Sequence, residues 1–278
     1  MDEIEKTLKT YSRDASLFEI KPQVVVFPKN SSDVKELVKW VNTNKKNFPA
    51  LSITPRSAGT DMSGGPLNDS VIVDFTKYMN KIIKVTDDFA VAEPGCFYRD
   101  FDKETRKKDR IMPAYTASRE ICAIGGMVAN NSGGEKSIRY GKVENYVKKL
   151  KVVFTDGNEY EVKPMSLSEL EEKIKEENFE GGLYRKLYEI LKNNYDEIKS
   201  AKPDVSKNSS GYYLWNIYDK DKQTFDLCQL IVGSQGTLGI VTEITFGLVP
   251  IPKYSNLLVV FLPSIDHVSE LVNRVLPY

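Results

Sequence analysis

The chain has 278 residues, 41% of them hydrophobic, and its 39 basic residues are balanced by 39 acidic ones. This length fits one large or two small domains, and the apolar fraction is sufficient for a sizeable core. The balanced charge gives no general attraction to nucleic acid, and no apolar run is long enough to predict a membrane span.

Histidine and cysteine are both scarce. The single histidine, His267, excludes a zinc site built on several histidines and a catalytic histidine at any earlier position. The three cysteines (Cys96, Cys122 and Cys228) form no CxxC pair, so we expect reduced thiols and a cytoplasmic protein. The first residues contain no apolar core of a signal peptide.

The first 75 residues alternate between strand and helix patterns. Strands are predicted at 22–28, 51–55 and 71–75, which is consistent with a small α/β subdomain. A helix is predicted after the first strand, with Asp33 and Glu36 as its capping pair. Its buried face is expected to contain Val34, Leu37, Val38 and Val41.

The next part of the chain is dominated by strand patterns. Asp156-Gly157 predicts a tight hairpin, and one helix is expected near Ser168 with Glu171 as its capping partner. A polar loop is expected at 200–213. The predicted strands are IIKV, FAVAEPG, LKVVFTDG, EYEVKP, DLCQLIVG and GIVTEITFGLV. A further amphipathic helix is expected to bury Leu183, Leu187, Ile190 and Leu191.

The pattern restarts after Pro252. Residues 256–262 (NLLVVFL) predict a strand, and Val268, Leu271, Val272 and Val275 predict a helix. A single strand and helix have too little chain to bury their apolar faces, so we expect the first fragment of a further domain. The alternative is a terminal strand and helix that dock on the main body.

Glycine clusters in segments where turns alone would not need so many. The first, PRSAGTDMSGG (55–65), follows a predicted strand and offers consecutive backbone N–H groups around Gly59, which suits a pyrophosphate. It matches neither GxxxxGK[ST] nor a GxGxxG that opens a helix, so neither triphosphate hydrolysis nor a Rossmann NAD site is indicated. A plain surface loop is the alternative.

Three further segments follow. In residues 113–134, two glycine pairs permit close approach of a flat or phosphorylated ligand, and Asn130 and Asn131 offer uncharged donors and acceptors; a glycine-rich hairpin is the alternative. GSQGTLGIVTE (233–243) is a glycine-rich turn that enters a strand, or simply a tight β-connection. AEPG (92–95) is interpreted as a structural turn.

In combination, these motifs resemble the FAD-linked oxidases with a vanillyl-alcohol-oxidase or PCMH-type FAD domain, from about Tyr11 to Pro250. Within that group the chain is most similar to the D-lactate dehydrogenase and glycolate oxidase branch. The resemblance implies an α+β fold in which two α/β subdomains, 1–78 and 79–252, hold FAD between them. Residues 253–278 would begin a truncated C-terminal cap domain.

The resemblance also implies which residues bind the FAD. The loop 55–61 would bind the pyrophosphate through backbone N–H groups, and Gly125 and Gly126 would let the backbone approach it. Residues 129–132 would lie near the flavin, and 235–241 would close over the adenine, with a backbone contact from Ile240. Pro113, Thr116 and Ser118 would lie near the ribityl and phosphate portions. The full implied set is Pro55, Arg56, Ser57, Ala58, Gly59, Thr60, Asp61, Pro113, Thr116, Ser118, Gly125, Gly126, Ala129, Asn130, Asn131, Ser132, Gln235, Gly236, Thr237, Gly239, Ile240 and Val241.

Two departures from the family pattern bear on the cofactor. Relatives with covalent FAD carry a histidine where this chain has Thr60, so the FAD is expected to be non-covalent. Cys122 is not at the spacing of cysteinyl-tethered relatives and is expected to be a buried thiol. Residues 207–219 resemble a family region near the flavin and the substrate entrance, although Tyr212 and Tyr213 could simply be packing aromatics.

The implied activity is oxidation of a 2-hydroxy acid, such as D-lactate or glycolate, with hydride transfer to FAD and electrons passing to an unidentified acceptor. In relatives the cap supplies histidines and often a metal site. No residue of this chain is a convincing catalytic base, and no metal site is expected. The alternatives are an FAD-holding subunit that needs a partner chain, or another flavoenzyme on the same fold, such as an NADPH-dependent UDP-sugar reductase.

Overall fold

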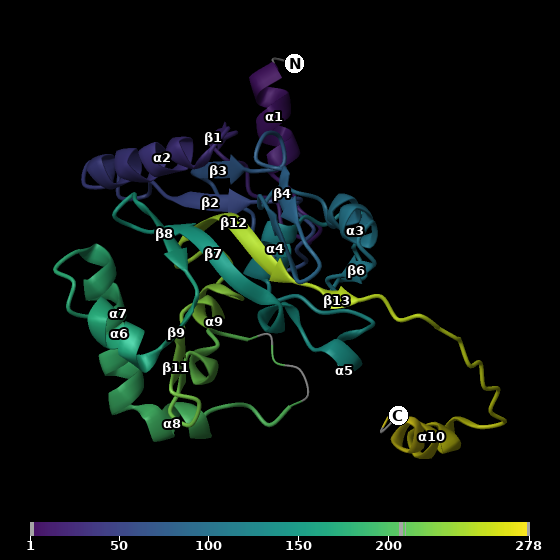
Figure 1. Ribbon diagram of the computed structural model, residues 1–278. Helices are drawn as coiled ribbons and strands as arrows, with labels where there is room; N and C mark the ends of the chain where they lie inside the picture. The colour runs from purple at the N-terminus through teal and green to yellow at the C-terminus, as the bar shows by residue number, and fades with distance from the viewer. Residues whose placement is uncertain (1–2, 206–207, 209, 277–278) are drawn as a thin grey trace.

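The N-terminal part of the chain folds around a parallel sheet of three strands. In the computed structural model, which describes residues 3–205, 208 and 210–276, the strand order is β1-β3-β2 (Figure 1). Val34 and Val38 of helix α2 pack with Val71 and Val73 of the central strand in one core. The elements of this part are α1 (Glu3–Tyr11), β1 (Val24–Val26), α2 (Ser31–Asn44), β2 (Ile53–Arg56) and β3 (Val71–Asp74).

Helix α2 begins earlier than its predicted capping pair. The side chain of Asn30 accepts hydrogen bonds from the N–H groups of Ser32 and Asp33, and the Asp33 carboxylate accepts one from Lys29 N–H. Asp33 is therefore the residue three positions inside the helix rather than its N-cap. The prediction of Asp33 and Glu36 as the capping pair was wrong by one turn, because Asn30 is also a strong N-cap residue.

The larger sheet is antiparallel and has the order β4-β5-β12-β7-β8. Its central strand β12 comes from the end of the main body, and Ile244 lies opposite both Ala92 of β5 and Leu150 of β7. All three side chains are buried. The strands are β4 (Ile82–Val85), β5 (Phe89–Ala92), β7 (Val147–Val153), β8 (Glu159–Val162) and β12 (Ile240–Gly247).

The predicted hairpin at Asp156-Gly157 is confirmed. It joins β7 to β8, with Val153 opposite Glu159, and Gly157 has a φ of 73°. The Asp156 carboxylate accepts a hydrogen bond from Asn158 N–H across the turn. This backbone conformation strains any residue with a Cβ, which explains why glycine follows the aspartate here.

A small third sheet of order β10-β11-β9 lies beside helices α6 to α8. Helix α6 has a complete capping box between Ser166 and Glu169, so the predicted Ser168–Glu171 pair was wrong by two residues. In α7, Leu191 is buried whereas Ile190 is exposed. The elements are β9 (Pro164–Ser166), α6 (Leu167–Lys173), α7 (Phe179–Asn193), α8 (Tyr195–Ser200), β10 (Tyr218–Asp219) and β11 (Thr224–Asp226).

The segment DLCQLIVG was predicted as a strand and is instead a short helix, α9 (Cys228–Ile231). The Asp226 carboxylate accepts a hydrogen bond from Cys228 N–H just before the helix begins. A helix of one turn is too short to show a helical periodicity, so the sequence does not distinguish it from a strand. The remaining short elements are α3 (Tyr98–Arg106), β6 (Arg110–Ile111), α4 (Ile124–Ala129), α5 (Ser137–Tyr140), β13 (Val249–Pro250) and the 3-10 turns Val143–Asn145, Leu214–Asn216 and Ile265–His267.

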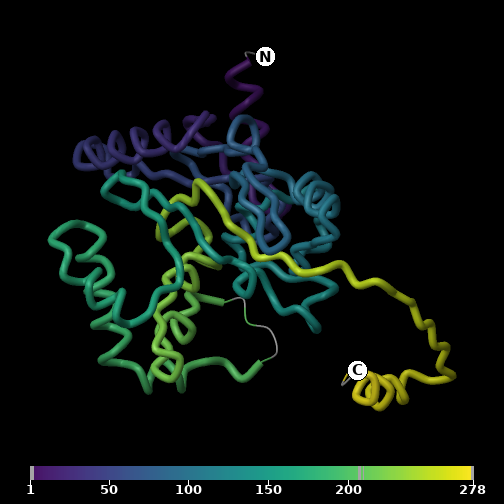
Figure 2. Tube along the Cα trace, viewed as in Figure 1, coloured from purple at the N-terminus to yellow at the C-terminus, as the bar shows by residue number. Residues whose placement is uncertain are grey.

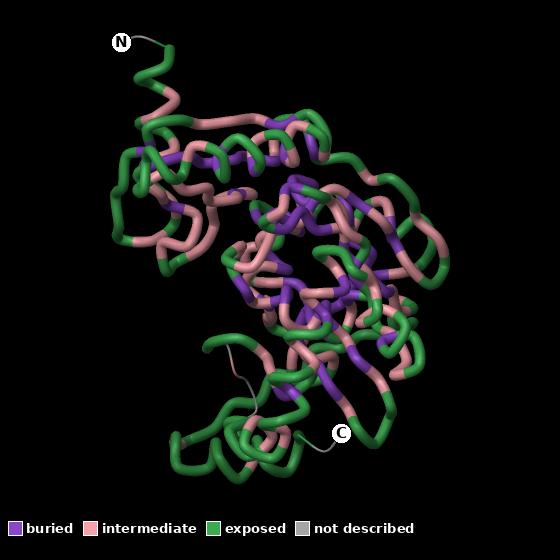
Figure 3. The backbone as a smooth tube through the Cα atoms, turned by 90° about the vertical axis from the view of Figure 1, so that its left-hand side faces the viewer, coloured by how far each residue is buried: buried purple, intermediate pink, exposed green. Residues whose placement is uncertain are grey.

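The buried side chains form two clusters that share the larger sheet. The main cluster lies between that sheet and the helices around it, whereas the smaller one lies between α2 and the parallel sheet. Val153 of β7 and Ile240 of β12 belong to the smaller cluster, so the two sheets are packed against each other. Figure 3 shows the buried residues concentrated in this central region.

After β13 the chain leaves the main body as an extended arm that ends in α10 (Val268–Val275) (Figure 2). The predicted helix is confirmed, but residues 256–262 form no strand, and Leu257 and Phe261 are 89% and 91% exposed. An apolar strand needs a neighbouring strand, and none is within reach in the described part of the arm. No helix in the described ranges combines the length and apolar character that a membrane crossing requires.

Candidate cofactor site

The loop that follows β2 presents a row of backbone donors. In the part of the chain that the structure describes, the N–H groups of residues 57–61 form no hydrogen bond with the protein. Gly59 lies at a φ of 66°, which turns the backbone so that successive N–H groups can converge. A row of unpaired donors of this kind is suited to phosphate oxygens.

Arg56 supports this loop from behind. Its guanidinium donates to the carbonyl oxygen of Arg13 at 2.8 Å and lies 5.1 Å from the centre of the Tyr11 ring. A Cβ on Gly59 would lie 2.5 Å from Nη2 of Arg56 and would displace the guanidinium, and the φ of 66° would also strain any other residue there. The guanidinium of Arg56 therefore interacts with the N-terminal segment. The unpaired donors of the loop are the backbone N–H groups that follow it, from Ser57 onward.

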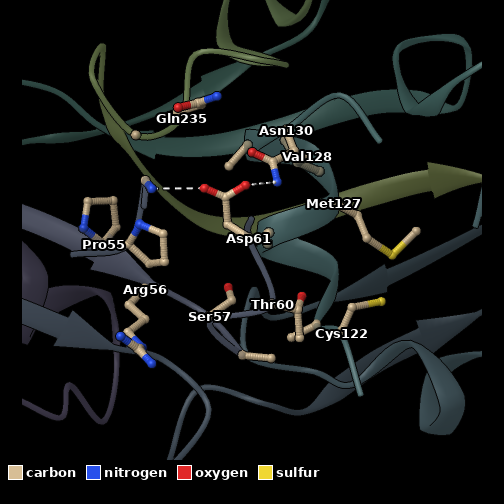
Figure 4. A pocket seen from close by; sticks show the side chains of 18 of the residues that line it. Pro55, Arg56, Ser57, Thr60, Asp61, Cys122, Met127, Val128, Asn130 and Gln235 are labelled. Carbon is tan, nitrogen blue, oxygen red and sulfur yellow. Dashed lines mark hydrogen bonds between the residues drawn. The ribbon is translucent and has the colours of Figure 1, made fainter. Parts of the chain in front are cut away.

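Asp61 links the first glycine-rich segment to the second (Figure 4). Oδ2 accepts hydrogen bonds from Gly65 N–H and the Ser63 hydroxyl, both at 2.8 Å, and Oδ1 accepts one from Asn130 Nδ2 at 3.2 Å. Burial raises the pKa of Asp61, but these hydrogen bonds outweigh it and the pKa lies below its usual value. The carboxylate is thus ionised at neutral pH and holds the two segments together.

Pro94, in the turn interpreted as purely structural, joins the same two segments. Its carbonyl oxygen accepts hydrogen bonds from Gly125 N–H at 2.9 Å and from the Ser57 hydroxyl at 3.2 Å. A Cβ on Gly125 would lie 2.7 Å from both Pro94 and Ser57, so that glycine is required for packing. Gly126 differs, because its Cβ would meet only Ser57 at 3.8 Å, and its own N–H has no acceptor in the described chain.

The third glycine-rich segment, 233–243, contacts the other two. Gln235 N–H donates a hydrogen bond to the carbonyl oxygen of Ala129 at 3.0 Å, and Gln235 itself has a backbone φ of 53°. Gly236 lies against Pro55, where a Cβ would be 2.4 Å from the proline ring. The three segments, which are far apart in the sequence, therefore meet around one space.

That space is a cavity of about 570 Å³, within the usual range for ligand sites. All but four of the residues implied by the family resemblance lie in its wall. Those in the wall are Pro55, Arg56, Ser57, Ala58, Gly59, Thr60, Asp61, Thr116, Ser118, Gly125, Gly126, Ala129, Asn130, Ser132, Gln235, Gly236, Gly239 and Val241.

The remaining four serve the surrounding structure. The Asn131 side chain accepts a hydrogen bond from Glu144 N–H at 3.0 Å, and the Thr237 hydroxyl bonds to Tyr212 and to the Ser234 carbonyl oxygen. Pro113 and Ile240 are buried outside the cavity wall. Within the segment 207–219, Lys207 and Ser209 lie outside the described residues.

Several wall residues were not identified from the sequence. Ser63 and Gly65 lie in the glycine-rich loop that the sequence singled out, but beyond the stretch implied by the family. Met62 lies in the same loop and is 82% exposed, and Pro94 carried a signal in the AEPG turn. The buried apolar members of the wall look like ordinary core residues, namely Phe75, Ala123, Met127, Val128 and Ile231.

Cys122 is buried as predicted, at 3% exposure, but it also lies in the cavity wall. Its sulfur accepts a hydrogen bond from the Thr116 hydroxyl at 3.5 Å. Burial raises the pKa of this thiol above its usual value, against the lowering effect of hydrogen bonds from Thr116 and Ser118. At neutral pH it is a protonated thiol and a poor nucleophile.

This donor set suits a dinucleotide with a pyrophosphate. The unpaired N–H groups of 57–61 and Gly126 offer hydrogen bonds without a bulky side chain, and the cavity continues past them toward Cys122 and Gln235. The described chain contains no group of three or more histidine, cysteine or acidic residues arranged to hold a metal ion.

Comparison with known proteins agrees with this geometry. The sequence pattern of the family described as "FAD binding domain" matches residues 22–163, about half of the chain. The chain belongs to this family of FAD-binding domains, and its resemblance to the PCMH-type FAD oxidases is confirmed.

The relatives compared below are longer than this chain. It is 26% identical over 259 residues to D-2-hydroxyglutarate dehydrogenase of Escherichia coli, covering 92% of this chain and 25% of the relative. It is 26% identical to the glycolate oxidase subunit GlcD of Bacillus subtilis (96% and 45%) and 28% identical to D-lactate dehydrogenase of Anaerostipes hadrus (91% and 41%). The chain thus spans from a quarter to just under half of the length of these relatives.

A solved structure of alkyldihydroxyacetonephosphate synthase shares the fold, with a TM-score of 0.60 and 18% identity over 91% of this chain and 38% of that one. The predicted α+β, PCMH-type fold is therefore confirmed.

We predict that Gly126→Val lowers FAD affinity by about 100-fold or more, about 2.7 kcal/mol, because the new side chain would fill space beside Ser57 in the cavity. The matched control is Gly182→Val in α7, another helical glycine with nothing within 4 Å of its would-be Cβ, but distant from the cavity. Flavin fluorescence titration of both variants, with circular dichroism for folding, measures the effect. Unchanged affinity in Gly126→Val would remove this glycine from the site.

We also predict that Asp61→Ala weakens FAD binding about tenfold, about 1.4 kcal/mol, since Gly65 N–H and Asn130 lose their acceptor and the two segments loosen. Asp61→Asn keeps one oxygen for Gly65 and should fall between that variant and the wild type. Asp69→Ala in the same loop region is the control. Tighter binding in Asp61→Ala would show that the carboxylate mainly repels the phosphates.

Proposed function

We propose that this chain is the FAD-binding part of an oxidoreductase that oxidises a 2-hydroxy acid such as D-lactate or glycolate. The observation that carries the proposal is the row of unpaired N–H groups at 57–61 in one cavity with Gly126. The names of relatives supply the substrate class, because three of them act on D-2-hydroxyglutarate, glycolate or D-lactate. When bound, FAD would supply the two-electron acceptor for this reaction.

Each segment of the wall has a proposed role toward the cofactor. The loop 55–61 and Gly126 would hold the pyrophosphate, and residues 235–241 would close over the adenine. Residues 129–132 would lie near the flavin, with Thr116 and Ser118 beside the ribityl and phosphate portions. Pro113, Asn131, Thr237 and Ile240 would act from just outside the wall, by fixing these segments. The protein would exclude water from the cofactor and orient it.

The proposed binding mode is non-covalent. Thr60 stands in the wall at the position where tethered relatives have histidine, and its hydroxyl is a poor nucleophile. Cys122 is the other candidate for a covalent tether. Burial raises the pKa of its thiol, so it is not a thiolate at neutral pH.

The domain organisation follows the same proposal. Residues 1–78 and 79–252 would be the two halves of the FAD-binding unit, and 253–278 the first unit of a substrate or cap domain. The exposed apolar side chains of the arm, such as Leu257 and Phe261, support this role because a covering surface would bury them. That surface would belong to the cap or to a partner chain, and the name of GlcD identifies that relative as a subunit.

A cytoplasmic location is proposed from the cysteines. All three, each within the described residues, are free and buried. Unpaired thiols are typical of a reducing compartment.

We predict that the purified chain binds one FAD that acid precipitation releases completely. Non-covalent hydrogen bonds do not survive unfolding, whereas a tether would. The measurement is flavin absorbance in the supernatant and pellet, with chromatography to distinguish FAD from FMN. Colour retained in the pellet would contradict the non-covalent proposal, and FMN would contradict the adenine site.

We predict that D-lactate, glycolate or D-2-hydroxyglutarate reduces the bound flavin, but slowly. Proton abstraction needs a base, and in the described wall the only carboxylate is Asp61, which is occupied by three hydrogen bonds. Anaerobic stopped-flow at the flavin band measures the rate, with the L-enantiomers as controls. Rapid, saturable bleaching would show a complete active site, whereas reduction by NADPH alone would favour a different flavoenzyme on this fold.

A further inference from the structure

Residues 11–20, which follow most of helix α1, pack against the first glycine-rich loop, and we call them the N-terminal strap. The strap precedes the region 22–163 that matches the FAD-binding family. None of its residues, all of which the structure describes, lies in the wall of the cofactor cavity. It nevertheless contacts the loop on both sides of the donor row 57–61, at Arg56 and at Gly64.

Hydrogen bonds within the strap join its beginning to its end. Arg13 and Glu19 lie opposite each other in an antiparallel β-bridge, and their side chains form an ion pair. Ile20 N–H donates to the carbonyl oxygen of Ser12 at 2.9 Å, and Ser12 is buried. Because the two ends are bonded to each other, the two contacts between the strap and the loop are not independent.

The guanidinium of Arg56 makes the first contact. Nη2 donates to the carbonyl oxygen of Arg13 at 2.8 Å, Nη1 donates to that of Tyr11 at 3.4 Å, and the guanidinium lies 5.1 Å from the centre of the Tyr11 ring. The same group touches Gly59, where a Cβ would lie 2.5 Å from Nη2. Figure 4 shows the Arg56 side chain directed away from Asp61. The guanidinium therefore contacts both the strap and the middle of the donor row.

Acidic groups of the protein surround the charge of Arg56. Arg56 lies opposite Asp74 in the register of β2 and β3, and both residues are buried. Burial lowers the pKa of the guanidinium, and the negative charges of Asp74 and Asp14 oppose that shift. Asp14 belongs to the strap. Arg56 therefore acts on the donor row through its position, rather than as a free cation for a phosphate.

The second contact is apolar and is made by Phe18. Its ring lies against Gly64, where a Cβ would be 2.9 Å from Cδ2 of the ring. Gly64 has a φ of 84°, and its carbonyl oxygen accepts a hydrogen bond from Leu67 N–H at 3.1 Å. Phe18 is 58% exposed, so it contributes little to the core and its main apolar contact is with this turn. The strap thus supports the loop beyond Asp61 as well as before Ser57.

We propose that the N-terminal strap is a functional part of the cofactor site, and that Arg56 and Phe18 are positioning residues that hold the donor row 57–61 in its binding conformation. The inference rests on the proposed binding of FAD, but not on the proposed substrate. Energetic coupling between two parts of a protein is reciprocal. If the strap stabilises the loop that binds FAD, bound FAD stabilises the strap by the same factor.

Flavin fluorescence titration of substituted chains with FAD tests the positioning roles. Arg56→Met removes the donors to the strap and should weaken FAD about tenfold. Arg56→Lys keeps the charge and one donating group, so it should recover part of that loss. Arg185→Met is the matched control, because Arg185 also donates to two carbonyl oxygens, those of Ile174 and Glu176, but lies outside the cavity wall. Its affinity for FAD should be unchanged.

Phe18→Ala tests the second contact without altering the cavity wall. It should weaken FAD about threefold, because the turn at Gly64 loses its apolar support. Phe48→Ala is the matched control, since Phe48 is exposed to a similar degree, 63%, and lies outside the strap and the wall. Circular dichroism checks the folding of every variant.

Amide hydrogen exchange measures the reciprocal effect, which a strap that only supports the fold would not show. Saturating FAD should slow exchange of Ile20 N–H about tenfold in the wild-type chain, and by much less in Arg56→Met. Gly157 N–H is the internal reference, because it donates to the carbonyl oxygen of Phe154 in a hairpin outside the cavity wall. Its exchange should not respond to FAD.

Two results overturn the proposal. One is exchange at Ile20 that FAD leaves unchanged in the wild-type chain, and the other is an FAD affinity that both Arg56→Met and Phe18→Ala leave unchanged. Should Arg56→Met fail to fold, Phe18→Ala and the exchange of the wild-type chain decide the question. A wild-type chain that binds no FAD would instead contradict the proposed function, so the two failures are distinguishable.

Discussion

Backbone N–H groups, rather than cationic side chains, provide the positive wall of the cofactor cavity. The guanidinium of Arg56 is bound to the N-terminal segment, and in the described chain the amides of 57–61 and Gly126 are unpaired donors, to which we assign the phosphate charge in our proposal. An amide donor works only where the ligand can approach the main chain closely. Gly126 meets this requirement, because its Cβ would meet only Ser57 at 3.8 Å, whereas a Cβ on Gly125 or Gly236 would collide with Pro94 or Pro55, so those glycines serve the packing of the segments.

Holding those segments together requires interactions that do not occupy the donors themselves. Asp61 does so from inside the loop by binding Gly65 and Asn130, and the carbonyl oxygen of Pro94 does so by binding Gly125 and Ser57. These bonds are formed between protein groups alone, so they fix the shape of the cavity wall. Such preorganisation reduces the ordering that binding would otherwise require.

The sequence predicted the parts of this arrangement that depend on local backbone geometry. The glycine-rich loops and the Asp156-Gly157 hairpin could be located because positive φ values and close backbone approach restrict residue choice. Most of the residues that the family resemblance implies lie in the wall of one cavity, and their contacts with FAD stay predictions; the implied set did not include Ser63, Gly65 or Pro94. Residues that act through a carbonyl oxygen leave no side-chain signal, and Pro94 belongs to that class.

Predictions that depended on distant partners were less successful. The segment around Cys228 is a helical turn, and its sequence is too short to show a helical periodicity, so it fits a strand equally well. Residues 256–262 have strong β-propensity, but a strand also needs a neighbour to pair with.

The order of strands in the larger sheet has a consequence for synthesis on the ribosome. Strand β12 occupies the centre of the sheet, between β5 and β7, yet it is the last of that sheet's strands along the chain. Until it emerges, the hairpins β4–β5 and β7–β8 each present an unpaired edge, and exposed edges are templates for association with other chains. The nascent chain therefore passes through a long interval in which its two earlier hairpins await the same late strand. During that interval a chaperone would find its main binding opportunity at these two edges.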